Sequence, residues 1–175
     1  AGACMGVRVV PKDVLGEVEA VPRSTNLCPG QPSVAPLGSG PAMKPASLQC
    51  ALLVTGPCYV TKSAADAYRF ARAVLKQGHG VSQIFFYQEG VHNASQLVQP
   101  AGDEHHLQQA WTELAREHDL TLDVCVAAAL RRGVSDQDNS TQAGLAQWNL
   151  APPFRLSGRG SLAQAALSAD RVVQV

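Results

Sequence analysis

From residue 48 onward, short apolar segments alternate with segments of helical periodicity, and this alternation allows only a few folds. Residues that favour buried strands dominate the segments 48–54, 81–87, 121–125 and 171–175. Apolar residues at helical spacing predict a helix from Ser63 that Gly78 ends, a helix capped by Asp103, and a helix over about 161–169. We predict an α/β fold of three layers (α/β/α), in which helices cover both faces of a mainly parallel sheet of about five strands. The fifth strand is expected around 151–157.

Residues 1–46 differ in composition from the rest of the chain. Prolines recur through 22–45 together with glycine and serine, and no apolar periodicity accompanies them. Such a segment buries too little apolar surface to offset the entropy lost on ordering. We therefore expect residues 1–46 to be a disordered extension, with Met43 as a candidate natural start, and we place the folded domain at 47–175. Val7–Val10 has the composition of a strand but no neighbour in the sequence to pair with.

The charge and cysteine content exclude several classes of protein. Lys and Arg together number 14, as do Asp and Glu, so the formal net charge is zero, and no long basic run occurs. A protein that grips nucleic acid by its phosphates needs clustered Lys and Arg, so direct nucleic-acid binding is not expected. No apolar run approaches the ~18 residues of a membrane span. The cysteines number 5, an odd count without a C-x-x-C pair, which favours free thiols and a cytoplasmic location.

Cys125 is the main candidate for chemistry because of its place in the predicted fold. It ends the strand 121–125 and precedes an apolar helical segment, 126–132, that Gly133 closes. The thiol is therefore predicted at the carboxyl end of a strand, which is the edge where open α/β sheets bind ligands. Free helical N–H groups and the helix dipole stabilise a thiolate there. From position alone, Cys125 is either a nucleophile or sulfur carrier, or one more buried small apolar residue.

Two further candidates follow other strands at the same predicted edge. Cys58 follows 48–54, and His92 follows 81–87 in a long segment, 88–102, that is predicted as a loop. Cys58 is either a second sulfur-handling thiol or a tolerated small residue, and His92 either polarises the sulfur or is a surface histidine. The histidines lack the spacing of zinc ligands, and no P-loop, G-x-G-x-x-G or G-x-S-x-G motif occurs. We therefore expect no metal, nucleotide or flavin.

Other segments near these candidates have alternative roles. Arg131 and Arg132, at the carboxyl end of the helical segment after Cys125, complement its dipole and could also face an acidic partner. The apolar stretch Ile84–Tyr87 is either core or part of a subunit interface. Residues 134–156 show no sustained periodicity and are predicted to be irregular, apart from the strand expected at their end.

Several stretches of the domain resemble the TusD/DsrE sulfurtransferase family. They are Val54–Tyr59 (VTGPCY), Phe85–Ala94 (FFYQEGVHNA) and, above all, Val124–Val134 (VCVAAALRRGV). The carboxyl-terminal segments Leu156–Gly158 and Ala169–Val173 are similar as well. The resemblance covers about residues 48–175, in order, and leaves 1–46 outside it.

The resemblance implies a DsrE-like fold and a sulfur-relay subunit in which Cys125 carries sulfur as a persulfide, without a cofactor. It implies assembly with two related small subunits (TusB- and TusC-like) into a heterohexamer, and TusA- and TusE-like proteins as upstream and downstream sulfur carriers. In the Tus branch the sulfur reaches the 2-thio group of the wobble uridine in tRNA. In the Dsr branch, related proteins move sulfur in dissimilatory sulfur oxidation. Cys58 departs from the family, in which a small residue without a thiol is expected.

Two alternatives from other classes stay open at this point. If Cys125 is an inert core thiol, the chain is a non-catalytic subunit of such a complex, and the thiol resists alkylation in the native protein. If flavin or nucleotide copurifies with it, the chain is instead a flavodoxin-like ligand-binding module.

Overall fold

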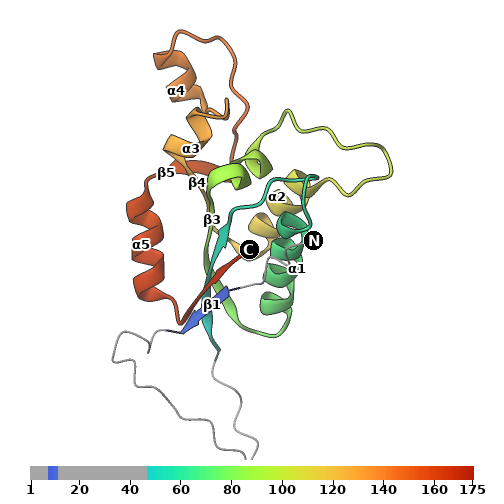
Figure 1. The fold of residues 1–175 in the computed structure, drawn as a ribbon, viewed down its shortest axis with the longest axis vertical. Coiled ribbons are helices and arrows are strands. Elements are labelled where there is room, and N and C mark those ends of the chain that lie inside the picture. The colour runs from blue at the N-terminus through green and yellow to red at the C-terminus, as the bar shows by residue number, and fades with distance from the viewer. Residues whose placement is uncertain (1–7, 12–46) are drawn as a thin grey trace, which may run out of the picture.

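The computed structural model describes residues 8–11 and 47–175 and contains one six-stranded sheet (Figure 1). Five strands run parallel in the order β6-β2-β3-β4-β5, and β1 joins β6 antiparallel at one edge. This confirms the predicted mainly parallel sheet, with the fifth strand where it was expected. The strands are β1 (Arg8–Pro11), β2 (Gln49–Val54), β3 (Gly80–Phe86), β4 (Leu122–Cys125), β5 (Phe154–Ser157) and β6 (Arg171–Gln174).

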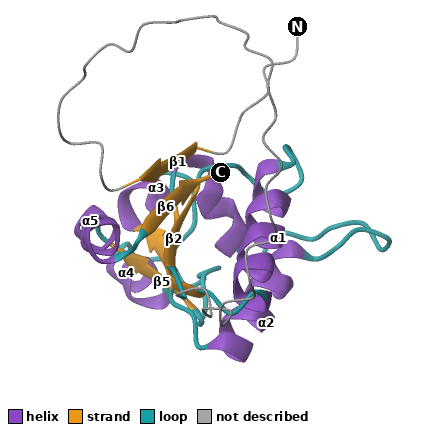
Figure 2. Cartoon of the chain, turned by 90° about the horizontal axis from the view of Figure 1, so that it is seen from below, coloured by secondary structure: helices purple, strands orange, loops and turns teal. Residues whose placement is uncertain are grey.

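Helices cover both faces of the sheet, which gives the predicted three layers. The helices α1 (Ser63–Lys76) and α2 (Leu107–His118) pack on one face, and α5 (Arg159–Ser168) packs on the other (Figure 2). Shorter helices follow the carboxyl ends of the strands: the 3₁₀ helix η1 (Gln88–Ala94), α3 (Val126–Leu130) and α4 (Gln137–Gln142). Within residues 8–11 and 47–175, no helix has the length and apolarity needed to cross a bilayer.

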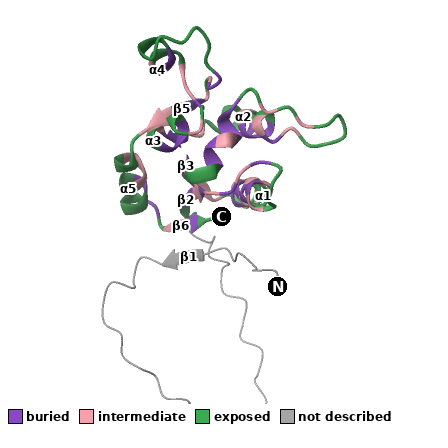
Figure 3. Ribbon diagram, turned by 45° about the horizontal axis from the view of Figure 1, so that its top comes forward, coloured by how far each residue is buried: buried purple, intermediate pink, exposed green. Residues whose placement is uncertain are grey.

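The core lies between the sheet and the helices α1 and α2 (Figure 3). The Trp111 ring of α2 meets the Phe86 ring of β3 edge to face, with 5.5 Å between centroids and 86° between planes. Phe86 also contacts Phe154 on β5, so aromatic contacts connect a helix to strands on both sides of β4. Ile84 and Phe85 are fully buried as well. Of the two roles open to Ile84–Tyr87, the structure therefore supports core for its first three residues.

The strand in the amino-terminal segment has a partner that the sequence did not reveal. Arg8–Pro11 pairs with Arg171–Gln174, with Arg8 opposite Gln174. The prediction that this strand lacks a neighbour was wrong, because its partner lies at the other end of the chain. The rest of the segment 1–46 lies outside the described residues, and the predicted extension there stays a prediction.

Helix boundaries also differ from the predicted ones. Asp103 does not cap α2. The helix begins only at Leu107, whose side chain is buried in the core. The N-cap is His106, whose Nδ1 accepts a hydrogen bond from the backbone N–H of Gln109 at 3.4 Å. Two segments predicted as irregular contain helical turns, since η1 lies within 88–102 and α4 within 134–156.

We expect Gly90→Ala to destabilise the domain, because η1 packs directly on the end of β2. A Cβ atom on Gly90 would lie 2.2 Å from the backbone oxygen of Val54, which also accepts a hydrogen bond from the N–H of Tyr87. The backbone has to move, at a cost of about 1–3 kcal/mol in the free energy of unfolding measured in urea. Gly102→Ala is the control, since a Cβ atom there meets nothing within 4 Å. Equal stability of the two variants would contradict the packing described here.

Candidate functional site

Cys125 lies where the sequence predicted, at the carboxyl end of β4 and in the N-cap position of α3. Its residue is only 2% exposed, yet it lines a cavity of about 250 Å³. The thiol is therefore sheltered from bulk solvent but borders an open space. The other residues around the cavity come from three segments: Tyr87, Gln88, Ala127, Ala128, Arg131, Arg132 and Arg159.

Positive charge surrounds this cavity, and one of its arginines is held by a carboxylate. Arg132 Nη2 and Nε donate to Glu89 Oε1 at 2.6 and 2.9 Å. The hydrogen bond from Arg132 lowers the pKa of Glu89, so this carboxylate stays ionised well into the acid range. The hydrogen bond to Glu89 likewise raises the pKa of Arg132, and the negative charge of a Cys125 thiolate adds to this in the same direction. Arg132 is thus fixed as a permanent cation beside the sulfur.

Arg159 was missed as a site residue, although a signal for it exists in the chain. It begins α5, directly after Gly158, and β5 runs beside β4 with Ser157 opposite Cys125. The loop after β5 therefore opens at the same edge as the thiol. If the strand 154–157 is placed next to the strand 122–125, Arg159 is predicted at the same edge of the sheet as Cys125.

Asp123, two residues before Cys125 on β4, is a fully buried carboxylate joined to three other elements. Its Oδ1 accepts a hydrogen bond from Arg155 Nε of β5 at 2.6 Å, and its Oδ2 accepts one from Ser161 Oγ of α5 at 2.7 Å. Gln83 Nε2 of β3 also donates to Oδ2. The hydrogen bond to Asp123 raises the pKa of Arg155. Because a buried carboxylate without such partners is strongly disfavoured, this cluster fixes the start of α5 against β4.

Cys58 lies at the same edge of the sheet but is not among the residues around the Cys125 cavity. Its Sγ lies 3.7 Å from the backbone oxygen of His92, to which it donates a weak hydrogen bond. Burial raises the pKa of the Cys58 thiol, so Cys58 is protonated at neutral pH. Cys50 is buried in β2 with its pKa also raised by burial, as expected of a core residue. Neither thiol lines the cavity that the arginines surround.

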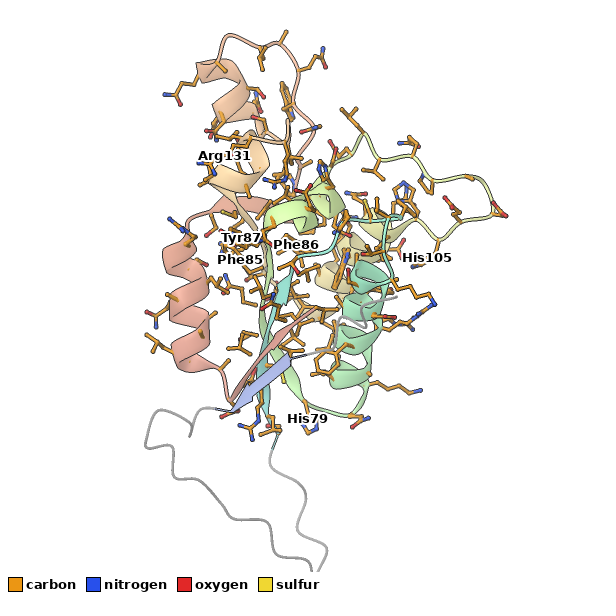
Figure 4. The ribbon with its side chains drawn as sticks, in the orientation of Figure 1. His79, Phe85, Phe86, Tyr87, His105 and Arg131 are labelled. Carbon is orange, nitrogen blue, oxygen red and sulfur yellow. The ribbon has the colours of Figure 1, made fainter. Side chains whose placement is uncertain are left out.

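The histidines do not gather around the sulfur. His92 Nε2 contacts Glu89 Oε2 at 3.5 Å, and His92 does not line the cavity, so of the two roles left open for it, polarising the sulfur has no support in the geometry. In Figure 4, Tyr87 and Arg131 lie at one end of the sheet, whereas His79 lies at the opposite end and His105 beside α1 and α2. In the described part of the chain, no three His, Cys, Asp or Glu side chains are grouped as metal ligands would be.

A larger apolar groove, of about 780 Å³, lies beyond α3 and next to α4. It shares Leu130 and Gly133 with the segment that follows Cys125, but not the thiol itself. Leu145 and Trp148 on its wall are 60% and 45% exposed. The chain therefore presents apolar surface close to the thiol cavity but separate from it.

Comparison with known proteins finds relatives of most of the described part of the chain. The model of the DsrE/DsrF-like family matches residues 49–175. A Serratia proteamaculans protein named Sulfurtransferase TusD is 58% identical over 127 residues, which cover 73% of this chain and 98% of that protein. A Proteus mirabilis protein of the same name is 56% identical over 128 residues, with the same coverage.

Among solved structures, the chain is similar to the ychN protein of E. coli. The TM-score is 0.59 with 20% sequence identity, over 73% of this chain and 99% of that one. At this level of identity the likeness concerns the fold alone, and it agrees with the parallel sheet and helix layers described above.

We expect Cys125 to react with iodoacetamide in the native protein faster than Cys50 and Cys58, by about tenfold or more. Cys125 borders a cavity lined by three arginines, whereas Cys50 and Cys58 do not line it and burial raises the pKa of both thiols. A short labelling pulse at neutral pH, followed by peptide mass spectrometry, measures the three rates in one sample. In urea the three rates should converge. Slower labelling of Cys125 than of Cys58 in the native protein would show the thiol to be inert.

Proposed function

The chain belongs to the DsrE/DsrF-like family, and on this basis we propose that it is a sulfurtransferase that carries persulfide sulfur on Cys125. The observation that carries the proposal is the position of this thiol, at the end of β4 beside a cavity with cationic walls. The relatives at 58% and 56% identity, both named as sulfurtransferases, support the same activity.

The proposed reaction is thiolate attack on a persulfide. The Cys125 thiolate attacks the terminal sulfur of a donor persulfide, R–S–SH, and the S–S bond of the donor breaks. The donor leaves as the thiolate R–S⁻, and the proton stays on the transferred sulfur, so the product is Cys125–S–SH. The acceptor thiolate later repeats this attack and releases the Cys125 thiolate. No electrons are gained or lost overall, and no metal, flavin or nucleotide takes part.

The surroundings of Cys125 suit each state of this cycle. The attacking and leaving species are both thiolates, which positive charge and the amino end of a helix stabilise. Arg132, locked by Glu89, supplies a cation that does not depend on pH in the physiological range. Cys58 is not needed, since the exchange uses one thiol of this chain at a time.

We further propose that the sulfur passes along a relay whose destination is the 2-thio group of the wobble uridine in tRNA. The partners in this proposal are two related small subunits (TusB- and TusC-like), which form a heterohexamer with this chain. TusA- and TusE-like proteins are the sulfur carriers before and after it. The exposed Leu145 and Trp148 support a subunit interface, because apolar surface of this kind is typical of assembled proteins.

We propose that the activity resides in residues 47–175, in agreement with the family match at 49–175, and that 1–46 are an extension from which Arg8–Pro11 adds an edge strand to the sheet. It also places the protein in the cytoplasm. The free thiols of Cys50, Cys58 and Cys125 are compatible with a reducing compartment.

Cys125→Ser should abolish sulfur uptake, because serine cannot form a persulfide. The wild-type chain is incubated with a small persulfide donor, and intact mass spectrometry follows the addition of one sulfur atom. Cys58→Ala is the matched control and should take up sulfur at close to the wild-type rate. If Cys125→Ser still gains the sulfur at the wild-type rate, another cysteine of the chain is the carrier; if the wild-type chain gains none, the chain is a non-catalytic subunit.

Deletion of the gene should remove 2-thiouridine from bulk tRNA, and expression of the wild-type chain should restore it. Expression of Cys125→Ser should not restore it. Nucleoside mass spectrometry measures the modification directly. Unchanged thiolation together with lost growth on reduced sulfur compounds would contradict the tRNA destination and place the protein in dissimilatory sulfur oxidation.

A further inference from the structure

Two of the three arginines around the Cys125 cavity have no carboxylate partner within the described residues. Arg132 is paired with Glu89, whereas no ion pair forms at Arg131 or Arg159 among residues 8–11 and 47–175. Both side chains belong to exposed residues, and no Asp or Glu lines the cavity. The mouth of the cavity therefore carries positive charge that the described domain does not neutralise.

The position of Arg159 has no structural advantage of its own. Arg131 follows α3, where a positive charge complements the helix dipole. Arg159 is the first residue of α5, where the dipole disfavours a positive charge, and the preceding Gly158 provides no side-chain cap. The Asp123–Ser161 hydrogen bond nevertheless holds this end of α5 beside β4 and so keeps Arg159 at the cavity. The unfavourable charge therefore lies among the residues that line the cavity of Cys125.

We propose that Arg131 and Arg159 bind acidic side chains that flank the cysteine of the protein exchanging sulfur with Cys125. This inference depends on the proposed function, because it concerns how the partner of that reaction is recognised. Guanidinium groups bind carboxylates through paired hydrogen bonds, and the two arginines come from different elements, Arg131 from the end of α3 and Arg159 from the start of α5. A partner cysteine with Asp or Glu on both sides would satisfy both cations while its sulfur enters the cavity.

A protein segment fits this site better than RNA does. The Cys125 sulfur is nearly enclosed, and the cavity of about 250 Å³ admits a slender group such as a cysteine side chain. RNA is held through several phosphates and needs more clustered charge than two unpaired arginines in a chain of zero net charge.

The test uses the full chain with Cys125 already loaded as a persulfide by a small donor. Two synthetic peptides of equal length each contain one cysteine, flanked on both sides by glutamate or on both sides by lysine. Mass spectrometry measures how fast each peptide removes the sulfur, and the rate ratio of acidic to basic peptide is compared between protein variants. Comparing ratios cancels the intrinsic reactivity of each peptide thiol and any change in the reactivity of Cys125.

Reversing the two charges should reverse the preference. In Arg131→Glu/Arg159→Glu we expect the ratio to fall by about tenfold or more at low ionic strength, and the difference to vanish at about 0.5 M salt. Arg72→Glu/Arg116→Glu changes the net charge equally on α1 and α2 and should keep the wild-type ratio. Arg131→Lys/Arg159→Lys should keep most of the wild-type rate ratio. Arg159→Gln alone should lower this ratio in part without disrupting the helix α5.

Each other outcome has a distinct meaning. An unchanged ratio in the charge-reversed variant, with normal loading of Cys125, would overturn this inference and leave the proposed function intact. Bulk tRNA that binds through Arg131 and Arg159 and blocks the acidic peptide would show an RNA site instead. Failure of the wild-type chain to load any sulfur would overturn the proposed function, and this inference with it.

Discussion

The buried carboxylate of Asp123 is the interaction on which the arrangement around the thiol depends. Through Gln83, Arg155 and Ser161 it joins β4 to β3, β5 and α5. A carboxylate without exposure to water is stable only with partners of this kind, so the four elements have to meet in one register. Strand alternation puts Asp123 and Cys125 on the same face of β4, and the geometry that satisfies the carboxylate also places α5 at the sulfur.

The parts of the fold that sequence predicted well are those encoded by local patterns. A strand ends at Cys125 and is followed directly by a helical segment that Gly133 closes, so the edge position of the thiol could be predicted from the local sequence. The pairing of Arg8–Pro11 with β6 could not be predicted in this way, because nothing local relates segments at opposite ends of the chain. The start of α2 at Leu107 was missed for a similar reason, since burial in the core and not the nearest capping residue decides it.

In the candidate site as well, local sequence patterns predicted some features, and those that depend on long-range contacts were missed. Topology brought Cys58, His92 and Cys125 to one edge of the sheet, but side-chain direction separates them within it. Arg159 is held at the cavity by a hydrogen bond between Asp123 and Ser161, two residues that belong to no motif in the sequence. A site whose residues are brought together by long-range polar contacts is therefore hard to predict from composition or motif spacing. Its reactive cysteine can still be predicted, because it lies at the end of a strand.

The enclosure of Cys125 has a consequence for the lifetime of the sulfur it would hold. A persulfide on an exposed cysteine is lost to any small thiol that collides with it, and it is open to oxidation. Cys125 is only 2% exposed and lines a small cavity, so whether the sulfur is delivered or lost depends on which thiols can enter that cavity. The walls of the cavity slow the approach of the intended acceptor and of every other thiol. The fidelity of sulfur transfer then depends on the shape and charge of the cavity mouth as much as on the reactivity of the Cys125 thiol.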